Sequence, residues 1–253
     1  MVDDNAENTS VNPGFYNVKS YNNTWVDLNS SNYSYTITEN FSNHSINPAA
    51  LNELYYYPAS VTSLNPYASD SSTDSTFNYG HSLAYCTGSP CNLKGHLYNS
   101  GSFSSDPGNI FGQDPLFVNY SGGDYGLQAG SPAIAKGTYL TTVASGDSGS
   151  GTSLVVTDAG YFQDGYGITG VNGDCISVTT VGNHVCVTAV NYSTKTLTLA
   201  SGITRSSGDP VWLYSDSTGR QVLFGSAPNI GATFAGSTPV APAPPTLVTA
   251  VVQ

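Results

Sequence analysis

Charged residues are scarce in this chain, and basic residues are the rarest of them. Only 9% of the 253 residues are charged, and six lysines and arginines stand against seventeen acidic residues, which gives a net charge of −11. An average soluble domain carries roughly 25% charged residues. Binding to nucleic acid or to an anionic membrane surface depends on clustered Lys and Arg. The composition therefore argues against both partners.

Long apolar runs are also missing. No stretch approaches the roughly 20 apolar residues that a membrane-spanning helix needs, so we expect no membrane insertion. The polarity of the chain comes from Ser, Thr, Asn and Gly, which suit tight turns, and eighteen tyrosines with abundant Val and Thr suit strands. No long helical period appears. The sequence predicts an all-β protein.

One stretch organises the rest of the chain. Residues 114–118, Asp-Pro-Leu-Phe-Val, predict a short buried strand, and residues 123–127 predict a second strand after a Gly-Gly turn. Residues 130–134, Gly-Ser-Pro-Ala-Ile, then form a corner. Together these runs resemble the closing segment of secreted right-handed parallel β-helices of the pectate-lyase-like kind.

In that family an Asp-Ile-Gly-Ala segment completes the run, and residues 229–232, Asn-Ile-Gly-Ala, are similar to it much later in the chain. The resemblance implies the end of a β-helix with an insertion. The family also carries an Asp after Ala-Ile and before Ile-Gly-Ala. This chain has Ala135 and Asn229 there, which removes two carboxylates.

We therefore expect four parts. They are β-helix coils and loops at 1–144, an inserted small β-barrel or sandwich at 152–217, a closing β-helix strand at 218–236, and a Pro-rich linker with an extended strand at 237–253. Five strand-like runs with turns between them predict the barrel: residues 153–157, 175–178, 185–190, 196–199 and 211–214. Two local features are also expected: a helical turn at 48–54 and a flexible Gly-Ser linker at 145–151.

Four cysteines fall into two close pairs, Cys86 with Cys91 and Cys175 with Cys186. Even number and local pairing favour two disulfides and an extracellular or cell-surface location. His81 and His96 flank the first pair at spacings of five residues, so a Cys₂His₂ zinc site is the alternative. That spacing is unlike the usual zinc sites, and the disulfide is favoured.

Eight Asn-x-Ser/Thr sequences are candidates for N-glycosylation. They begin at Asn8, Asn22, Asn29, Asn32, Asn40, Asn43, Asn119 and Asn191. Six of these lie in the first 43 residues, so the sequence favours a glycan-coated N-terminal region. The alternative, that none is modified, holds if the source lacks the glycosylation machinery.

Carboxylates supply the only candidates for chemistry. A glycoside hydrolase needs two of them at a suitable separation, and by residue type the candidates are Asp70, Asp74, Asp106, Asp114 and Asp124. Calcium binding is an alternative role for Asp158, Asp164 and Asp174, although their spacing does not match an EF-hand loop. Neighbouring Gly and Pro residues indicate turn roles for these side chains. We expect no catalytic residue, no resident metal and no cofactor.

The end of the chain carries an apolar segment after a proline-rich stalk. Its apolar residues Leu247, Val248, Val251 and Val252 form a strand pattern that exposes side chains and edge hydrogen-bonding groups. Such a strand either packs on its own chain or adds to a neighbour's sheet. The sequence predicts a non-enzymatic, glycosylated extracellular structural protein. We expect it to self-associate through this strand as a filament subunit. The alternative is a carbohydrate-active module, either sugar-binding or the C-terminal part of a polysaccharide lyase.

Overall fold

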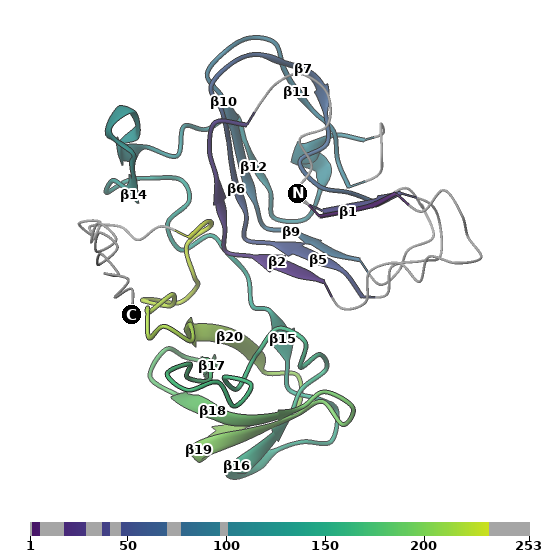
Figure 1. Cartoon of the computed structure of the whole chain (residues 1–253), viewed down its shortest axis with the longest axis vertical. Helices are drawn as coiled ribbons and strands as arrows, with labels where there is room; N and C mark the ends of the chain where they lie inside the picture. Colours follow the sequence, from purple (N-terminus) through teal and green to yellow (C-terminus); the bar gives the residue numbers. More distant parts are fainter. Residues whose placement is uncertain are drawn as a thin grey trace, which may run out of the picture.

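The computed structural model describes residues 2–5, 18–28, 37–40, 47–69, 77–96 and 101–232. Over these residues the chain is all-β, as predicted, with two short 3₁₀ helices, Phe103–Ser105 and Tyr120–Gly122. Parallel strands make up the first part and antiparallel strands the second (Figure 1). The tail residues Leu247, Val248, Val251 and Val252 lie outside the described residues, as do Asp70 and Asp74.

Four parallel sheets build the first part, which we call the parallel part (described residues from 2 to 111). The first sheet has the order β1 (Val2–Asn5), β4 (Ile37–Asn40), β8 (Ala68–Ser69). The second has the order β2 (Lys19–Tyr21), β5 (Ala49–Leu51), β9 (Asn78–Gly80). The third has the order β12 (Ile110–Phe111), β10 (Leu83–Cys86), β6 (Leu54–Tyr57), β3 (Thr24–Trp25), and β7 (Val61–Leu64) pairs with β11 (Cys91–Leu93).

Successive layers of the parallel part repeat the same corner. Asn22, Asn52 and His81 follow β2, β5 and β9, and all three have a left-handed backbone, with φ of 55°, 57° and 48°. Asn tolerates this conformation better than most residues. The Asn52 amide nitrogen donates to Asn22 Oδ1 at 3.3 Å across a sequence separation of 30 residues. The Asn side chains of two successive layers therefore contact each other at this corner.

The two faces of β6 pack against different cores. Tyr55 and Tyr57 belong to a cluster between the sheets that includes Tyr67 and Phe103, all fully buried. On the opposite face, Leu54 and its neighbours pack against residues from beyond the parallel part. The helical turn predicted at 48–54 is therefore wrong, because those residues extend as β5 and β6 with both faces buried.

The organising stretch covers that second face. β13 (Phe117–Asn119) and β14 (Asp124–Leu127) form an antiparallel hairpin that pairs with none of the parallel sheets. Phe117 packs on Tyr56, with ring centroids 5.3 Å apart. We predicted a further β-helix coil here, and that is wrong. The apolar outer side chains of β6 and β10 are instead buried beneath the hairpin, which contributes Leu127 to the same cluster.

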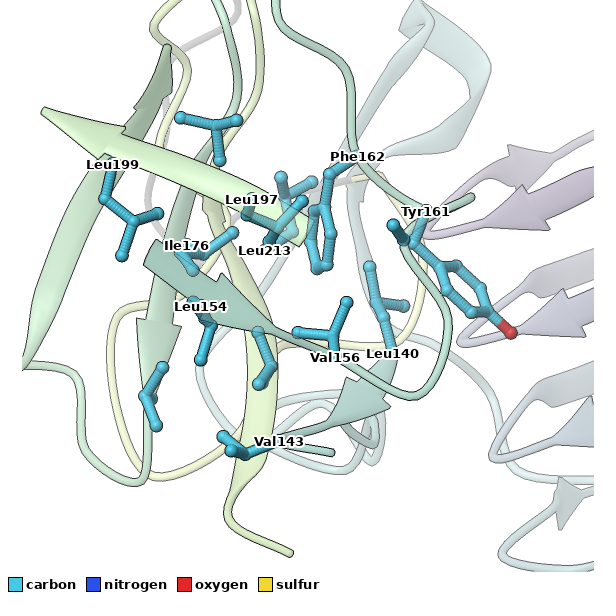
Figure 2. Close-up of a cluster of buried hydrophobic side chains, with 14 of the residues drawn as sticks. Leu140, Val143, Leu154, Val156, Tyr161, Phe162, Ile176, Leu197, Leu199 and Leu213 are labelled. Atoms are coloured by element: carbon cyan, nitrogen blue, oxygen red, sulfur yellow. The ribbon is translucent and has the colours of Figure 1, made fainter. Parts of the chain in front are cut away.

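The second part is a six-stranded antiparallel sheet that curls into a half-barrel. Its order is β15 (Thr141–Thr142), β20 (Pro210–Ser215), β17 (Cys175–Val178), β18 (His184–Asn191), β19 (Thr196–Arg205), β16 (Gly149–Val155). A bridge between Val143 and Val156 links the two outer strands. Leu154, Val156, Ile176 and Leu197 fill its core and are fully buried (Figure 2).

The expected flexible linker is mostly ordered by this sheet. Residues 149–151 belong to β16 and pair with residues 203–205 of β19. The carboxylate of Asp147 accepts two hydrogen bonds from the Arg205 guanidinium, at 2.6 and 3.0 Å, and one from the Val155 amide at 2.7 Å. A single half-buried ion pair thus fixes a segment that composition alone marks as flexible.

The chain then returns to the parallel part, although not as a strand. Ile230 is fully buried and its amide donates to the Ala133 carbonyl at 2.9 Å, and the Gly137 amide donates to the Pro228 carbonyl. The two distant pieces of the predicted closing motif therefore lie side by side. Gly231 has φ of 90°, and a Cβ there would come within 2.6 Å of Thr24 Oγ1. Only glycine lets the return segment approach β3 and β6 so closely.

Candidate functional site

A hollow that we call the junction cleft has a volume of 440 Å³ and lies where the parallel part, the half-barrel and the return segment meet. Residues 19–23 form one wall, and the half-barrel forms a second. The return segment from Arg220 to Ala232 closes the third side. Polar residues dominate its lining, among them Asn22, Asn23, Gln163, Asp174, Asp216 and Arg220.

A polar junction holds the walls of this cleft together. Lys19 Nζ lies 2.8 Å from Asp158 Oδ2, and the Asn47 amide nitrogen donates to the same oxygen at 2.8 Å. The Tyr21 hydroxyl donates to the Tyr161 carbonyl at 2.6 Å, and Asn78 donates to the Tyr161 hydroxyl at 2.9 Å. Figure 2 shows why one short segment serves both parts: Phe162 points into the half-barrel core and Tyr161 points toward the strands of the parallel part.

Burial and charge pairing compete at the Lys19–Asp158 pair. Burial lowers the pKa of Lys19, and the hydrogen bond and charge of Asp158 only partly oppose that shift. Burial acts to raise the pKa of Asp158, but hydrogen bonds from Lys19 and the Gly160 amide outweigh it, so the net shift of this pKa is downward. The 2.8 Å contact between the two groups joins β2 to the half-barrel, so the pair is a structural staple.

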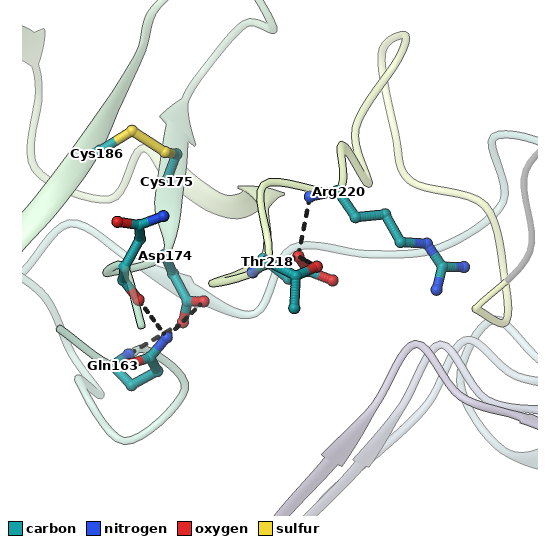
Figure 3. Close-up of a disulfide and its surroundings, with 8 residues drawn as sticks. Gln163, Asp174, Cys175, Cys186, Thr218 and Arg220 are labelled. Carbon is teal, nitrogen blue, oxygen red and sulfur yellow. Dashed lines mark hydrogen bonds between the residues drawn. A yellow bond between two sulfur atoms is a disulfide. The ribbon is translucent and has the colours of Figure 1, made fainter. Parts of the chain in front are cut away.

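The half-barrel side of the cleft is organised around Asp174. Its carboxylate accepts a hydrogen bond from the backbone amide of Gln163 at 3.0 Å and another from the side-chain amide of Gln163 at 3.3 Å (Figure 3). Burial raises the pKa of Asp174, and the nearby charge of Asp216 adds to that shift. Asp216 is held in a turn by the backbone amides of Thr218 and Arg220, each donating at 3.0 Å.

A second cluster surrounds His96 in the parallel part. Asp106 Oδ1 lies 2.7 Å from His96 Nδ1, and its other oxygen accepts from the Tyr67 hydroxyl at 3.0 Å. The His96 ring stacks on Tyr79, with centroids 4.0 Å apart. The carboxylate and the stacked ring fix the imidazole in place. Sequence reasoning assigned Asp106 a turn role and missed this contact, because the pair depends on packing with Tyr67.

Beneath the cleft wall lies a buried acid that sequence reasoning also missed. Glu53 is fully buried, and its carboxylate accepts from Ser20 Oγ at 3.1 Å, from the Asn23 side chain at 3.0 Å and from Trp25 Nε1. Burial raises its pKa to about 7, against the hydrogen bonds from Trp25, Asn23 and Ser20. The available signal was a lone carboxylate inside residues 49–57, a run that is otherwise apolar or aromatic apart from Asn52.

Both predicted cysteine pairs are disulfides. Cys86–Cys91 and Cys175–Cys186 account for all four cysteines, and Cys175 pairs directly with Cys186 across the β17–β18 hairpin (Figure 3). Within the described residues, no group of three or more His, Cys, Asp or Glu side chains could hold a metal ion. Because Cys86 and Cys91 form a disulfide, the alternative of a Cys₂His₂ zinc site with His81 and His96 is wrong.

The other singled-out carboxylates bind nearby backbone amides. Asp114 accepts from the Leu116 amide at 2.8 Å, and Asp124 accepts from the Gly126 amide at 3.0 Å. Asp164 accepts from Tyr166 in its own loop and from Val190 on β18. These geometries match the turn roles expected from the sequence.

The glycosylation candidates lie in different settings. Asn119 and Asn191 are exposed, each with a side-chain oxygen accepting from a backbone amide of a local turn. Asn22 is half-buried and its side chain joins the corner ladder, which leaves it poorly placed for a glycan. Asn40 ends β4, and the remaining four lie outside the described residues.

Comparisons with protein-family models, with curated proteins and with solved structures found no match to this chain. Among the described residues, no helix is both long and apolar enough to span a membrane.

Proposed function

We propose that this protein is a non-enzymatic extracellular structural protein, built on the end of a right-handed parallel β-helix that carries a small half-barrel. Layers that repeat mostly at 29 or 30 residues, the Asn corners and the adjoining pieces of the closing motif support the β-helix assignment. The two disulfides support an extracellular or cell-surface location.

One observation carries the structural role: three carboxylates hold the fold. Asp158 ties the half-barrel to the parallel part, Asp147 fixes the start of β16, and Asp106 anchors His96 and Tyr67. A glycosidase needs two carboxylates facing a substrate, and these three side chains bond within the protein instead. Side chains that tie separate parts of the chain together are what a structural role needs.

We extend the proposal to self-association through the apolar segment with Leu247, Val248, Val251 and Val252, by addition to a sheet of a neighbouring subunit. Contacts of this head-to-tail kind generate open filaments when they do not close into a ring. Asn119 and Asn191, exposed in turns, are the described positions suited to carry glycans.

Electron microscopy and sedimentation velocity test the assembly. The full chain is compared with a variant carrying Leu247→Ser, Val248→Ser, Val251→Ser and Val252→Ser. A matched control carries Ser substitutions at Val240 and Ala241 in the proline-rich stalk. We expect polymers for the full chain and the control, and monomers for the tail variant. Monomers in all three preparations would contradict self-association.

A further inference from the structure

The junction cleft has the size of a small-molecule site. Binding pockets for small ligands typically measure about 300–1,000 Å³ and often lie where two domains meet. The cleft, at 440 Å³, lies between the parallel part, the half-barrel and the return segment. It does not contribute to the assembly surface proposed above, so its role is a separate question.

The charges that line the cleft cancel. Lys19 and Arg220 are its cations, and Asp174 and Asp216 are its anions, in a chain whose net charge is −11. Lys19 is already paired with Asp158. An anionic ligand would meet two carboxylates without a surplus of positive charge, and a cation would meet Arg220. The electrostatics therefore favour a neutral ligand.

The remaining lining groups both donate and accept hydrogen bonds. Asn22, Asn23, Gln163 and Asn229 present side-chain amides, and Ser217 presents a hydroxyl. Leu213, Val222 and Ala232 add apolar surface beside them. A sugar has the complementary character, with hydroxyls that donate and accept around a ring edge and C–H faces that pack against apolar side chains.

The polar lining is also held in place before any ligand arrives. Asn22 is fixed by its contact with Asn52, Asn23 by the Glu53 carboxylate, and Gln163 by Asp174 and the Asn172 carbonyl. Fixing the groups in advance lowers the entropy cost of binding. We propose that the junction cleft binds a neutral saccharide of one or two sugar units.

Isothermal titration calorimetry on the full chain tests this proposal. The probes are cellobiose, maltose, lactose and N,N′-diacetylchitobiose, with digalacturonic acid as the charged comparison. Ser217→Trp obstructs the cleft, and Ser207→Trp places the same side chain on an exposed turn of the half-barrel away from it. Ser217→Leu is the smaller obstruction if the first variant does not fold, as judged by its thermal transition.

We expect at least one neutral disaccharide to bind, and we expect Ser217→Trp or Ser217→Leu to weaken that binding by about tenfold or more, while Ser207→Trp leaves it unchanged. Absence of binding for every neutral probe overturns the proposal. So does tighter binding of digalacturonic acid, or binding that survives obstruction of the cleft. None of these outcomes depends on polymer formation, so the proposal can fail while the structural role stands.

Discussion

Glu53 makes the stability of this protein depend on pH in an unusual direction. Its carboxyl group is fully buried with three neutral donors around it, and the structure describes no ion pair to it. Burial raises its pKa from 4.5 to about 7. Because the folded pKa lies above the unfolded one, the folded state binds the proton more tightly. Stability is then greatest below pH 4.5 and falls as the pH rises from 4.5 through 7.

The size of the effect follows from the shift. One pKa unit corresponds to about 1.4 kcal/mol, so ionisation of Glu53 removes roughly 3 kcal/mol of unfolding free energy by pH 8. Glu53→Gln removes this dependence and keeps the packing. Its carbonyl can accept from Trp25, and its amide can donate to Ser20 and to a flipped Asn23. The variant should match the wild type at pH 4 and exceed it by roughly 3 kcal/mol at pH 8.

Urea unfolding followed by intrinsic fluorescence, at whole pH values from 4 to 8, measures the difference. A companion variant, Trp25→Phe, removes the donor that most lowers the Glu53 pKa, so its loss of stability should continue to higher pH than in the wild type. A free-energy difference between wild type and Glu53→Gln that stays constant with pH would refute the reasoning. So would a Gln variant that is less stable at pH 8.

Three further substitutions test other parts of the account by equilibrium unfolding. Lys19→Met should lower the free energy of unfolding by about 3 kcal/mol, because Asp158 then loses its cation. Adding Asp158→Leu to this variant should restore most of the lost free energy. Losses that simply add in the double variant would contradict a structural role for the pair. Ala135→Gly should raise the free energy of unfolding by about 1 kcal/mol, because Ala135 has a left-handed backbone, with φ of 53°, that glycine adopts without strain. A lower free energy of unfolding in this variant would show that the backbone strain is absent. Tyr57→Phe should stabilise by about 1 kcal/mol, since the described residues offer its buried hydroxyl no partner, and destabilisation would reveal one.

The strands of the half-barrel could be predicted from the sequence because the pattern there is local. Cys175–Val178 was predicted at its observed bounds, and the run from Val211 to Tyr214 differs from β20 by one residue at each end. Alternating or apolar runs between clear turns carry this information. The Cys175–Cys186 disulfide followed from the same hairpin.

The parallel part was less predictable because its contacts join distant residues. The Pro-Ala-Ala-Leu start of residues 48–51 suggested a helical turn, but layers before and after it impose β5. Residues 117–127 have the composition of strands. That composition does not show whether the segment adds a coil to the parallel sheets or folds into a hairpin that covers them. That choice depends on the outward-facing apolar side chains of β6 and β10, which no local pattern relates to the hairpin.

The candidate site was the least predictable of all. Lys19, Asp174 and Arg220 come from three separate regions and carry no shared motif. The closing motif did relate residues 130–134 to residues 229–232, and the structure places them together. It gave no indication that a polar cleft would form beside them, because the cleft arises from how the half-barrel meets β2.

The central claim is that polar side chains join the parallel part and the half-barrel into one scaffold. Differential scanning calorimetry of the full chain tests it most directly. The account predicts a single transition whose calorimetric and van't Hoff enthalpies agree, because neither part unfolds without breaking the Lys19–Asp158 and Tyr21–Tyr161 contacts. Two separate transitions, unaffected by Lys19→Met, would contradict it.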